Sequence, residues 1–235
     1  MFCSATALQP IAAPAELIQN VRFYISTLIT VQQNIKISTV CYAKGRSMLT
    51  ASEIAAQIER GEIAWPGELR GNGLLLRLGS PLQLLADPGH VIDLANQDSI
   101  DTLCTQALHG WDEYELAPGR MALCAGEQPL RLGSAFVAAI ASLSHLARVG
   151  LAIHVASPWV MPGWDGHLTL ELLNVGPAKL RLRQGMPVGR ALIWHTDGAT
   201  HPPIPHDHYG RPEHLGSSYA AEFGAKLTAS SAGSE

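Results

Sequence analysis

The sequence predicts an all-β fold with a few short helices, arranged as a barrel or a sandwich, and three features indicate it. The apolar run Gly73–Gly79 (GLLLRLG) is short and bounded by glycines. The turn Ala117-Pro118-Gly119 precedes the apolar run Met121–Ala125. From Gly163 to Leu173, apolar and polar residues alternate with the period of two that a strand produces. Many short strands separated by Gly and Pro turns are typical of β-barrels and β-sandwiches.

Other elements follow from local signals. Thr50-Ala51-Ser52-Glu53 is a capping box that begins a helix, and Gly61 ends it. Asn96–Leu108 is predicted as a helix inserted between strands, and Val188–Trp194 as a further strand. Asp165-Gly166 is a typical hairpin turn, so we expect a hairpin there.

Composition limits the class of protein. The chain has 235 residues, of which 47% are apolar and 15% charged, as in an ordinary globular domain. A net charge of −4 argues against a nucleic-acid-binding protein, which would carry a basic face. No apolar run is long enough to cross a membrane. The four cysteines form no CxxC pair, which favours reduced thiols and a cytoplasmic location.

The ends of the chain differ from its middle. Residues 1–47 hold four basic residues and one acidic residue with no clear periodicity. A transit peptide has this composition, but an upstream extension is the favoured interpretation, because Met48 is followed directly by the helix start. We therefore expect an extension over 1–47, disordered or absent from the mature protein, a domain over 48–227 and a disordered tail over 228–235.

The candidate chemistry lies in two neighbouring segments. Ser144 and Arg148 are four residues apart, so in a short helix they project from one side, and an Arg suits polyphosphate oxygens. Farther along, His167, Thr169 and Glu171 share one face of a predicted strand, which makes Glu171 a candidate general acid/base. The alternatives are a surface ion pair for Arg148 and a solvated carboxylate for Glu171.

The run SLSHLARVGLAIHVASPWVMPGWDGHLTLELLNVG, over 142–176, resembles the central motif of dCTP deaminases, and the match needs no gap. The flanking segments MLTASEIAAQIERGEI, LRLG, ELAPGRMALCA and LRLRQGMPVGRALIW resemble the family as well. The resemblance implies a distorted jelly-roll fold shared with dUTPases, and a homotrimer with sites between its subunits. It also implies hydrolytic deamination of dCTP to dUTP with Mg²⁺ carried by the triphosphate and without zinc. The HxE and PCxxC motifs of zinc deaminases do not occur here.

The resemblance assigns roles residue by residue. Glu171 matches the catalytic Glu that activates water, and Ser144 matches the Ser that positions this water and contacts the nucleotide. Arg148 matches a phosphate-binding Arg. Thr169 and Leu170 match the strand backbone that reads the base.

Other positions of the expected nucleotide site depart from the family pattern. Leu143 replaces a second phosphate-binding Arg, and the loss of a charged hydrogen bond costs roughly 1.5–3 kcal/mol. Met161 replaces an Asp that meets the sugar 3′-hydroxyl. The remaining departures are His145 for a Ser, Ser157 for an Ala, Ser218 for a Lys and Glu222 for a Gln.

Three functional hypotheses stay open. The first is an active deaminase of dCTP or a related pyrimidine nucleotide, and the second is a degenerate member that acts as a nucleotide-binding or structural trimer. The third, a dUTP diphosphatase, is the weakest, because that chemistry in this fold normally uses an Asp close to the position of Met161, and the Asp is absent here.

A histidine-rich segment could bind a metal, although its spacing matches no known site and its prolines favour an irregular loop. Its histidines are His195, His201, His206, His208 and His214.

Overall fold

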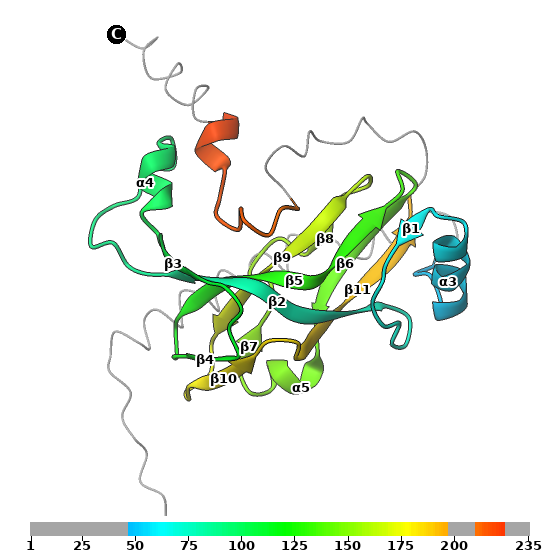
Figure 1. The fold of residues 1–235 in the computed structure, drawn as a ribbon, viewed down its shortest axis with the longest axis horizontal. Helices are drawn as coiled ribbons and strands as arrows, with labels where there is room; N and C mark the ends of the chain where they lie inside the picture. The colour runs from blue at the N-terminus through cyan, green and yellow to red at the C-terminus, as the bar shows by residue number, and fades with distance from the viewer. Residues whose placement is uncertain (1–46, 197–209, 224–235) are drawn as a thin grey trace, which may run out of the picture. The chain divides into compact units, whose positions relative to one another are not determined.

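The computed structural model describes residues 47–196 and 210–223, in which antiparallel strands dominate and the helices are short (Figure 1). The predicted fold class is therefore confirmed. The helices are α3 (Ala51–Glu59), α4 (Gln97–Asp101) and α5 (Ser144–Ala147), with a further helical turn over 219–223. The strands are β1 (Ile63–Ala64), β2 (Leu74–Leu85), β3 (Cys104–Leu108), β4 (Glu113–Leu116), β5 (Met121–Leu132), β6 (Phe136–Ser142), β7 (Leu151–Ala152), β8 (Trp159–Val160), β9 (Asp165–Asn174), β10 (Leu180–Arg183) and β11 (Pro187–His195).

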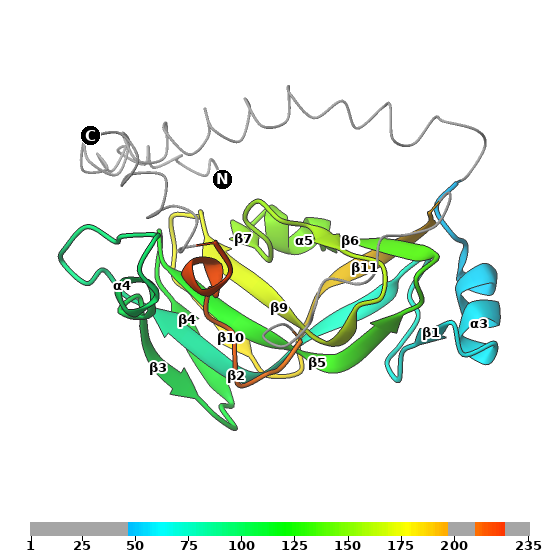
Figure 2. The same ribbon diagram turned by 90° about the horizontal axis from the view of Figure 1, so that it is seen from above.

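Within the described residues, nine strands form one sheet in the order β7-β9-β5-β2-β11-β6-β8, with β1 added to β5 and β3 added to β2. Figure 2 shows this sheet curling, and the second sheet, β10-β4, is a separate two-stranded ladder. Alternate side chains of the long strands form the core. Among the fully buried ones are Leu78, Leu82, Leu130, Phe136 and Leu170.

The predicted capping box at the start of α3 is present. The Glu53 N–H donates to the Thr50 hydroxyl at 3.4 Å, and the Thr50 N–H donates to the Glu53 carboxylate at 2.7 Å. Ile54 faces the core and is fully buried. Gly61 follows the helix with φ +73°, a left-handed conformation that glycine adopts without strain.

The predicted helix over Asn96–Leu108 is only partly correct. Asn96 caps the short helix α4, but residues 104–108 form strand β3, which pairs with the outer part of β2. As a strand, residues 104–108 form backbone hydrogen bonds with the available edge of β2. A longer helix would form its own hydrogen bonds but would have no packed face to stabilise it. Strand β2 continues past Gly79, where the sequence pattern ended it. Its register with β5 shifts between Leu78 and Leu82, and this irregularity accommodates Pro81, which has no N–H to donate to a neighbouring strand.

The predicted hairpin turn at Asp165-Gly166 is wrong. Both residues belong to β9 and pair with Arg131 and Leu130 of β5. The chain turns earlier, at Gly163, which has φ +81°. Gly166 is required for another reason: a Cβ there would lie 2.3 Å from the carbonyl oxygen of Gly210, so the glycine permits two backbones to touch.

The described cysteines, Cys104 and Cys124, are free thiols, as predicted. Burial raises the pKa of the Cys124 thiol to about 12, so it stays protonated and donates to the Gly79 carbonyl at 3.6 Å. Over the described ranges, no helix has the length and apolar character that a membrane span requires. Of the predicted extension over 1–47 only the last residue is described, and the predicted tail over 228–235 lies outside the described residues.

Candidate functional site

Glu171, the predicted catalytic residue, lies three residues before the end of β9. Its strand alternates as the sequence predicts. The buried side chains are Leu168, Leu170 and Leu172, and the partly exposed ones are His167, Thr169 and Glu171. The carboxylate therefore lies on the face of the sheet opposite the main core.

The neighbouring segment 153–155 holds Glu171 by its backbone and by its side chain. The Val155 N–H donates to the carboxylate oxygen Oε2 at 2.6 Å, and the Glu171 N–H donates to the Ile153 carbonyl at 3.0 Å. A charge-assisted bond of this length fixes the direction of the carboxylate. No described residue bonds to its other oxygen, Oε1, which is therefore available to a ligand or to water.

An unpaired stretch of β9 backbone lies beside Glu171. Every second N–H of this strand points to the same edge: His167 bonds there to the Gly210 carbonyl at 2.8 Å, Glu171 to Ile153 at 3.0 Å, and Val175 to Gly150 at 2.8 Å. Thr169 lies on that edge between His167 and Glu171, and no described residue bonds to its N–H there. Leu170 directs its backbone to the other edge, where it pairs with Cys124.

His154 lies between the two residues that bond to Glu171. Its ring nitrogen Nδ1 is buried and has no hydrogen-bond partner, the only such side-chain nitrogen or oxygen among the described residues. Burial lowers the pKa of the imidazole, and the negative charge of Glu171 acts in the opposite direction. The sequence pattern favoured a satisfied core histidine at this position, and the structure shows an unsatisfied one instead.

The phosphate-binding candidates lie together on and around α5. Leu143 is the N-cap of this helix, Ser144 and His145 form its first turn, and Arg148 follows its end. The side chains of Ser144, His145 and Arg148 are exposed. In the described part of the chain Arg148 makes no ion pair, so its guanidinium is available to an anion.

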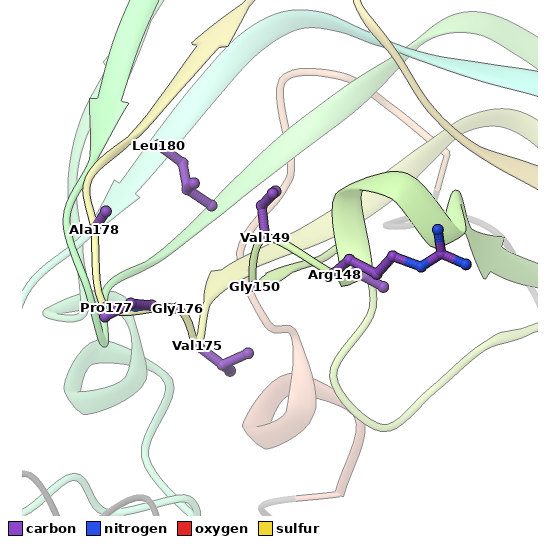
Figure 3. Close-up of a pocket in the computed structure, with 9 residues that line it drawn as sticks. Arg148, Val149, Gly150, Val175, Gly176, Pro177, Ala178 and Leu180 are labelled. Carbon is purple, nitrogen blue, oxygen red and sulfur yellow. The ribbon is translucent and has the colours of Figure 1, made fainter. Parts of the chain in front are cut away.

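Arg148 borders a pocket whose other walls come from α5 and from the turn after β9. These walls are largely apolar and are formed by Ala147, Val149, Gly150, Val175, Gly176, Pro177, Ala178 and Leu180. Figure 3 shows the Arg148 guanidinium pointing away from them. The pocket is therefore not the place where this guanidinium would meet a ligand.

Ser157 and Met161 flank strand β8 and are exposed. Strand β8 pairs with β6 and not with β9, so neither residue is hydrogen-bonded to the strand of Glu171. Ser218 precedes the helical turn 219–223, and its carbonyl accepts from the Glu222 N–H at 3.1 Å. Glu222 is exposed and Ser218 is partly exposed.

The C-terminal segment 210–216, which we call the strap, lies on the face that carries Glu171. Leu215 is only 8% exposed and packs on Leu123 and Ala125 of β5. These two residues pair directly with Glu171 and Thr169 of β9. Directly paired residues share a face, so Leu215 lies on the same face of the sheet as Glu171, and the strap borders the candidate site.

Helix α4 anchors the residues that follow the strap. The Gln97 side chain donates to the Ser217 carbonyl at 2.6 Å and accepts from the Ala221 N–H at 3.2 Å. Neither the strap nor this anchor was predicted from the sequence, since the contacts join residues far apart in the chain, 120 positions for Gln97 and Ser217. The one local signal was the glycine at 210, which has φ +79°.

The structure thus joins some predicted residues and not others. Glu171 and Thr169 lie on one face with the segment 153–155 and the strap. No hydrogen bond or ion pair between described residues links them to Ser144 or Arg148 on α5.

Of the five histidines considered for a metal, those at 201, 206 and 208 lie outside the described residues. The residues that are described contain no group of three or more His, Cys, Asp or Glu side chains able to hold a metal.

Comparison with known proteins identifies a family for this chain. Residues 48–196 match the family model described as dCTP deaminase-like. A protein from Methanoculleus marisnigri named "dCTP deaminase, dUMP-forming" is 33% identical over 156 residues, which cover 64% of this chain and 81% of that protein. A Rhodospirillum rubrum protein named dCTP deaminase is 34% identical over 151 residues, covering 59% of this chain and 77% of that protein.

Among solved structures, a 2′-deoxycytidine 5′-triphosphate deaminase from Agrobacterium tumefaciens is similar at a TM-score of 0.49 and 17% identity. The similarity covers 64% of this chain and 49% of that one.

Proposed function

The chain belongs to the dCTP deaminase-like family, and from this membership we propose that it is a hydrolase that deaminates dCTP to dUTP. The observation that carries the proposal is the arrangement around Glu171. A carboxylate with one fixed and one open oxygen lies next to an unpaired backbone edge at Thr169. A backbone N–H and C=O at such an edge can pair with the polar edge of a cytosine, which would bring its C4 toward the carboxylate.

The reaction follows from that placement. The open oxygen of Glu171 takes a proton from water, and the water oxygen forms a bond to C4 of the cytosine. Glu171 gives this proton to N3 of the base, then takes the remaining proton from the hydroxyl on C4 and gives it to the amino group. The C4–N bond breaks and ammonia leaves, so that water and dCTP give dUTP and ammonia. Val155 keeps the carboxylate in place through both transfers. Mg²⁺ enters with the triphosphate as part of the substrate, and zinc has no role in the proposal.

The phosphate side of the proposed site rests on α5. Arg148 supplies an exposed guanidinium for the phosphates, and Ser144 an exposed hydroxyl that, in the proposal, helps to position the attacking water and contacts the nucleotide. Leu143 offers no charge where the family has an Arg, and Met161 is an apolar side chain, 49% exposed, where the family has an Asp. We therefore expect weaker recognition of the triphosphate and of the sugar than of the base. His145, Ser157, Ser218 and Glu222 complete the proposed nucleotide-binding set.

The first test is incubation of the full chain with dCTP and Mg²⁺, followed by separation of the nucleotides and an ammonia assay. We expect dUTP and ammonia in equal amounts. Formation of dUMP with pyrophosphate would identify the dUMP-forming reaction, which the name of the Methanoculleus relative makes the second candidate. Nucleotide binding without turnover would contradict the proposal and favour a degenerate, nucleotide-binding member.

We also propose that the active assembly is a homotrimer with sites shared between subunits. The separation of the α5 residues from Glu171 supports it, since no direct contact joins them within one chain. Two inactive variants, Glu171→Gln and Arg148→Ala, test the sharing. If one site takes Glu171 from one subunit and Arg148 from another, mixing the unfolded variants and refolding them together restores part of the activity. Recovery no greater than that of each variant refolded alone contradicts shared sites.

A cytoplasmic location of the protein stays a prediction.

A further inference from the structure

Three neighbouring strands of the large sheet, β11, β6 and β8, carry apolar side chains on the face turned away from the core. Directly paired residues share a face, and the pairing joins Leu192 to Ala139 and Ala139 to Trp159 in one row across these strands. All three side chains are partly or largely exposed, while the residues next to them along β6 and β11 are buried in the core. We call this surface the tryptophan face, and it consists of Val137, Ala139, Trp159, Met161, Leu192 and Trp194.

The tryptophan face differs from an ordinary solvated sheet surface. An antiparallel sheet with one face in water places polar residues on that face. Here Trp159 is 46% exposed and Met161 49%, and the ring of Trp159 lies 6.3 Å from that of Trp194. Arg190 of β11 also faces outward, but its guanidinium extends toward Gly71, where a Cβ would lie 3.1 Å from Nη1. An uncharged, exposed surface that contains Trp and Met is typical of a contact surface between proteins.

A second apolar surface is the pocket beside α5. Val149 is 53% exposed and Val175 is 57% exposed, and both line this pocket. In Figure 3 the two valines lie at the pocket, and the Arg148 guanidinium points away from it. A chain seated in the pocket therefore covers apolar side chains and leaves the guanidinium of Arg148 free for an anion.

The positions of the two surfaces along the chain indicate what covers them. Strand β6 leads directly into α5, and β8 lies between Ser157 and Met161, which follow the segment that holds Glu171. Within one chain, no hydrogen bond or ion pair between described residues joins α5 to Glu171. A second copy that packs its tryptophan face on the pocket brings its own Ser157 and Met161 toward Arg148 of the first copy. Contacts between two different surfaces of identical chains can close into a ring.

We propose that copies of this chain associate through the tryptophan face of one copy and the apolar pocket of the next. Three such contacts close the proposed homotrimer. Each contact places Arg148, from the copy that supplies the pocket, beside Met161 from the copy that supplies the tryptophan face. The nucleotide site is incomplete until the second copy binds. The inference rests on the proposed function, since it names the surfaces that form its shared sites.

The test places a charge in each surface of the full chain, with Trp159→Glu and Val175→Glu. We expect the wild type to sediment at three times the 25.1 kDa mass of one chain. Each variant should need a protein concentration about 30-fold or more higher to associate, because a central contact is lost. Both positions are exposed in the single chain, so the circular dichroism spectrum should stay that of a folded protein. A mixture of the two variants should form a dimer, since it offers one intact tryptophan face and one intact pocket but cannot close a ring.

Leu94→Glu is the matched control, because Leu94 is 58% exposed and lies before α4, outside both surfaces. It should associate like the wild type. Hydroxyl-radical footprinting of the wild type needs no variant: Trp159 and Met161 should lose reactivity as the concentration rises through association, while Leu94 keeps its reactivity.

Three results overturn the proposal. A monomeric wild type does so and leaves the two surfaces to another partner. Charged variants that associate like the wild type do so as well, and so does wild-type association that leaves Trp159 fully reactive. Association is measured without nucleotide, so a wild-type trimer that does not deaminate dCTP overturns the proposed function and supports the interface. The two failures are therefore distinct.

Discussion

Replacement of Glu171 by Gln is expected to lower kcat for dCTP deamination by about 10²- to 10⁴-fold, the range that a positioned general acid/base contributes. Gln is nearly the same size and keeps a carbonyl oxygen, so it can still accept the Val155 N–H that holds Oε2 in the wild type. What it lacks is an oxygen that takes a proton from water. The fold and the affinity for dCTP should therefore stay close to those of the wild type.

Steady-state kinetics, a nucleotide-binding titration and a thermal melt separate these effects. The matched control is Glu115→Gln, because Glu115 also lies on a strand but is exposed and pairs with Arg181 at 3.0 Å. This control should retain the wild-type kcat. A Glu171→Gln protein that keeps more than about one tenth of the wild-type kcat would show that another group does the proton transfer.

Glu171→Asp is a second comparison that uses the same geometry. Asp keeps the charge but is shorter by one methylene group, so its carboxylate cannot both reach the Val155 N–H and keep its place beside Thr169. We expect kcat to fall here too, although an ionisable group is present. Equal activity of the Asp variant and the wild type would show that the bond to Val155 does not position the carboxylate.

Local sequence signals predicted a large part of this fold and of its site. The capping box at Thr50, the alternation of β9 and the apolar run of β11 each depend on residues close together in the chain. Glu171 was found in the same way, because its face follows from a period of two. The grouping of Ser144 and Arg148 on a short helix followed from their spacing of four.

The features that the sequence did not predict depend on partners far along the chain. Asp165-Gly166 has the local signature of a hairpin, yet the approach of Gly210 and the pairing with β5 place it in a strand. Strand β3 forms because β2 offers it an edge. His154 resembles any histidine among apolar residues, and only the packed structure shows that Nδ1 has no partner.

The largest expected effect on stability is at Asn174, the one fully buried polar residue of the described chain. Its side-chain amide donates to the Leu116 carbonyl at 2.9 Å and to the Ala178 carbonyl at 2.8 Å, and its oxygen accepts from the Gly176 N–H at 2.9 Å. These bonds tie the end of β9 to β4 and to the segment before β10. Asn174 therefore connects the large sheet to the small one.

Asn174→Leu is expected to lower the free energy of unfolding by about 3 kcal/mol, since a side chain of similar size fills the site but leaves buried backbone groups unpaired. Leu116 is 1% exposed, so its carbonyl has no access to replacement water. For a domain of this size the melting temperature should fall by roughly 6–12 °C. Denaturant unfolding and a thermal melt measure both quantities, with Asn72→Leu as the control. Asn72 is exposed and makes one hydrogen bond, to the Ala51 N–H at 3.1 Å, so the effect there should be small.

Asn174→Asp separates lost hydrogen bonds from simple misfit. A carboxylate at this position keeps the acceptor for Gly176 but brings a negative oxygen against the carbonyl oxygens of Leu116 and Ala178. The folded state therefore favours the protonated acid and raises its pKa above that of the unfolded chain. Because the folded state then binds more protons, the stability of this variant should increase relative to the wild type as the pH falls from 7 toward 4. A stability difference that is constant over that range would show that the three side-chain bonds of Asn174 do not hold the two sheets together.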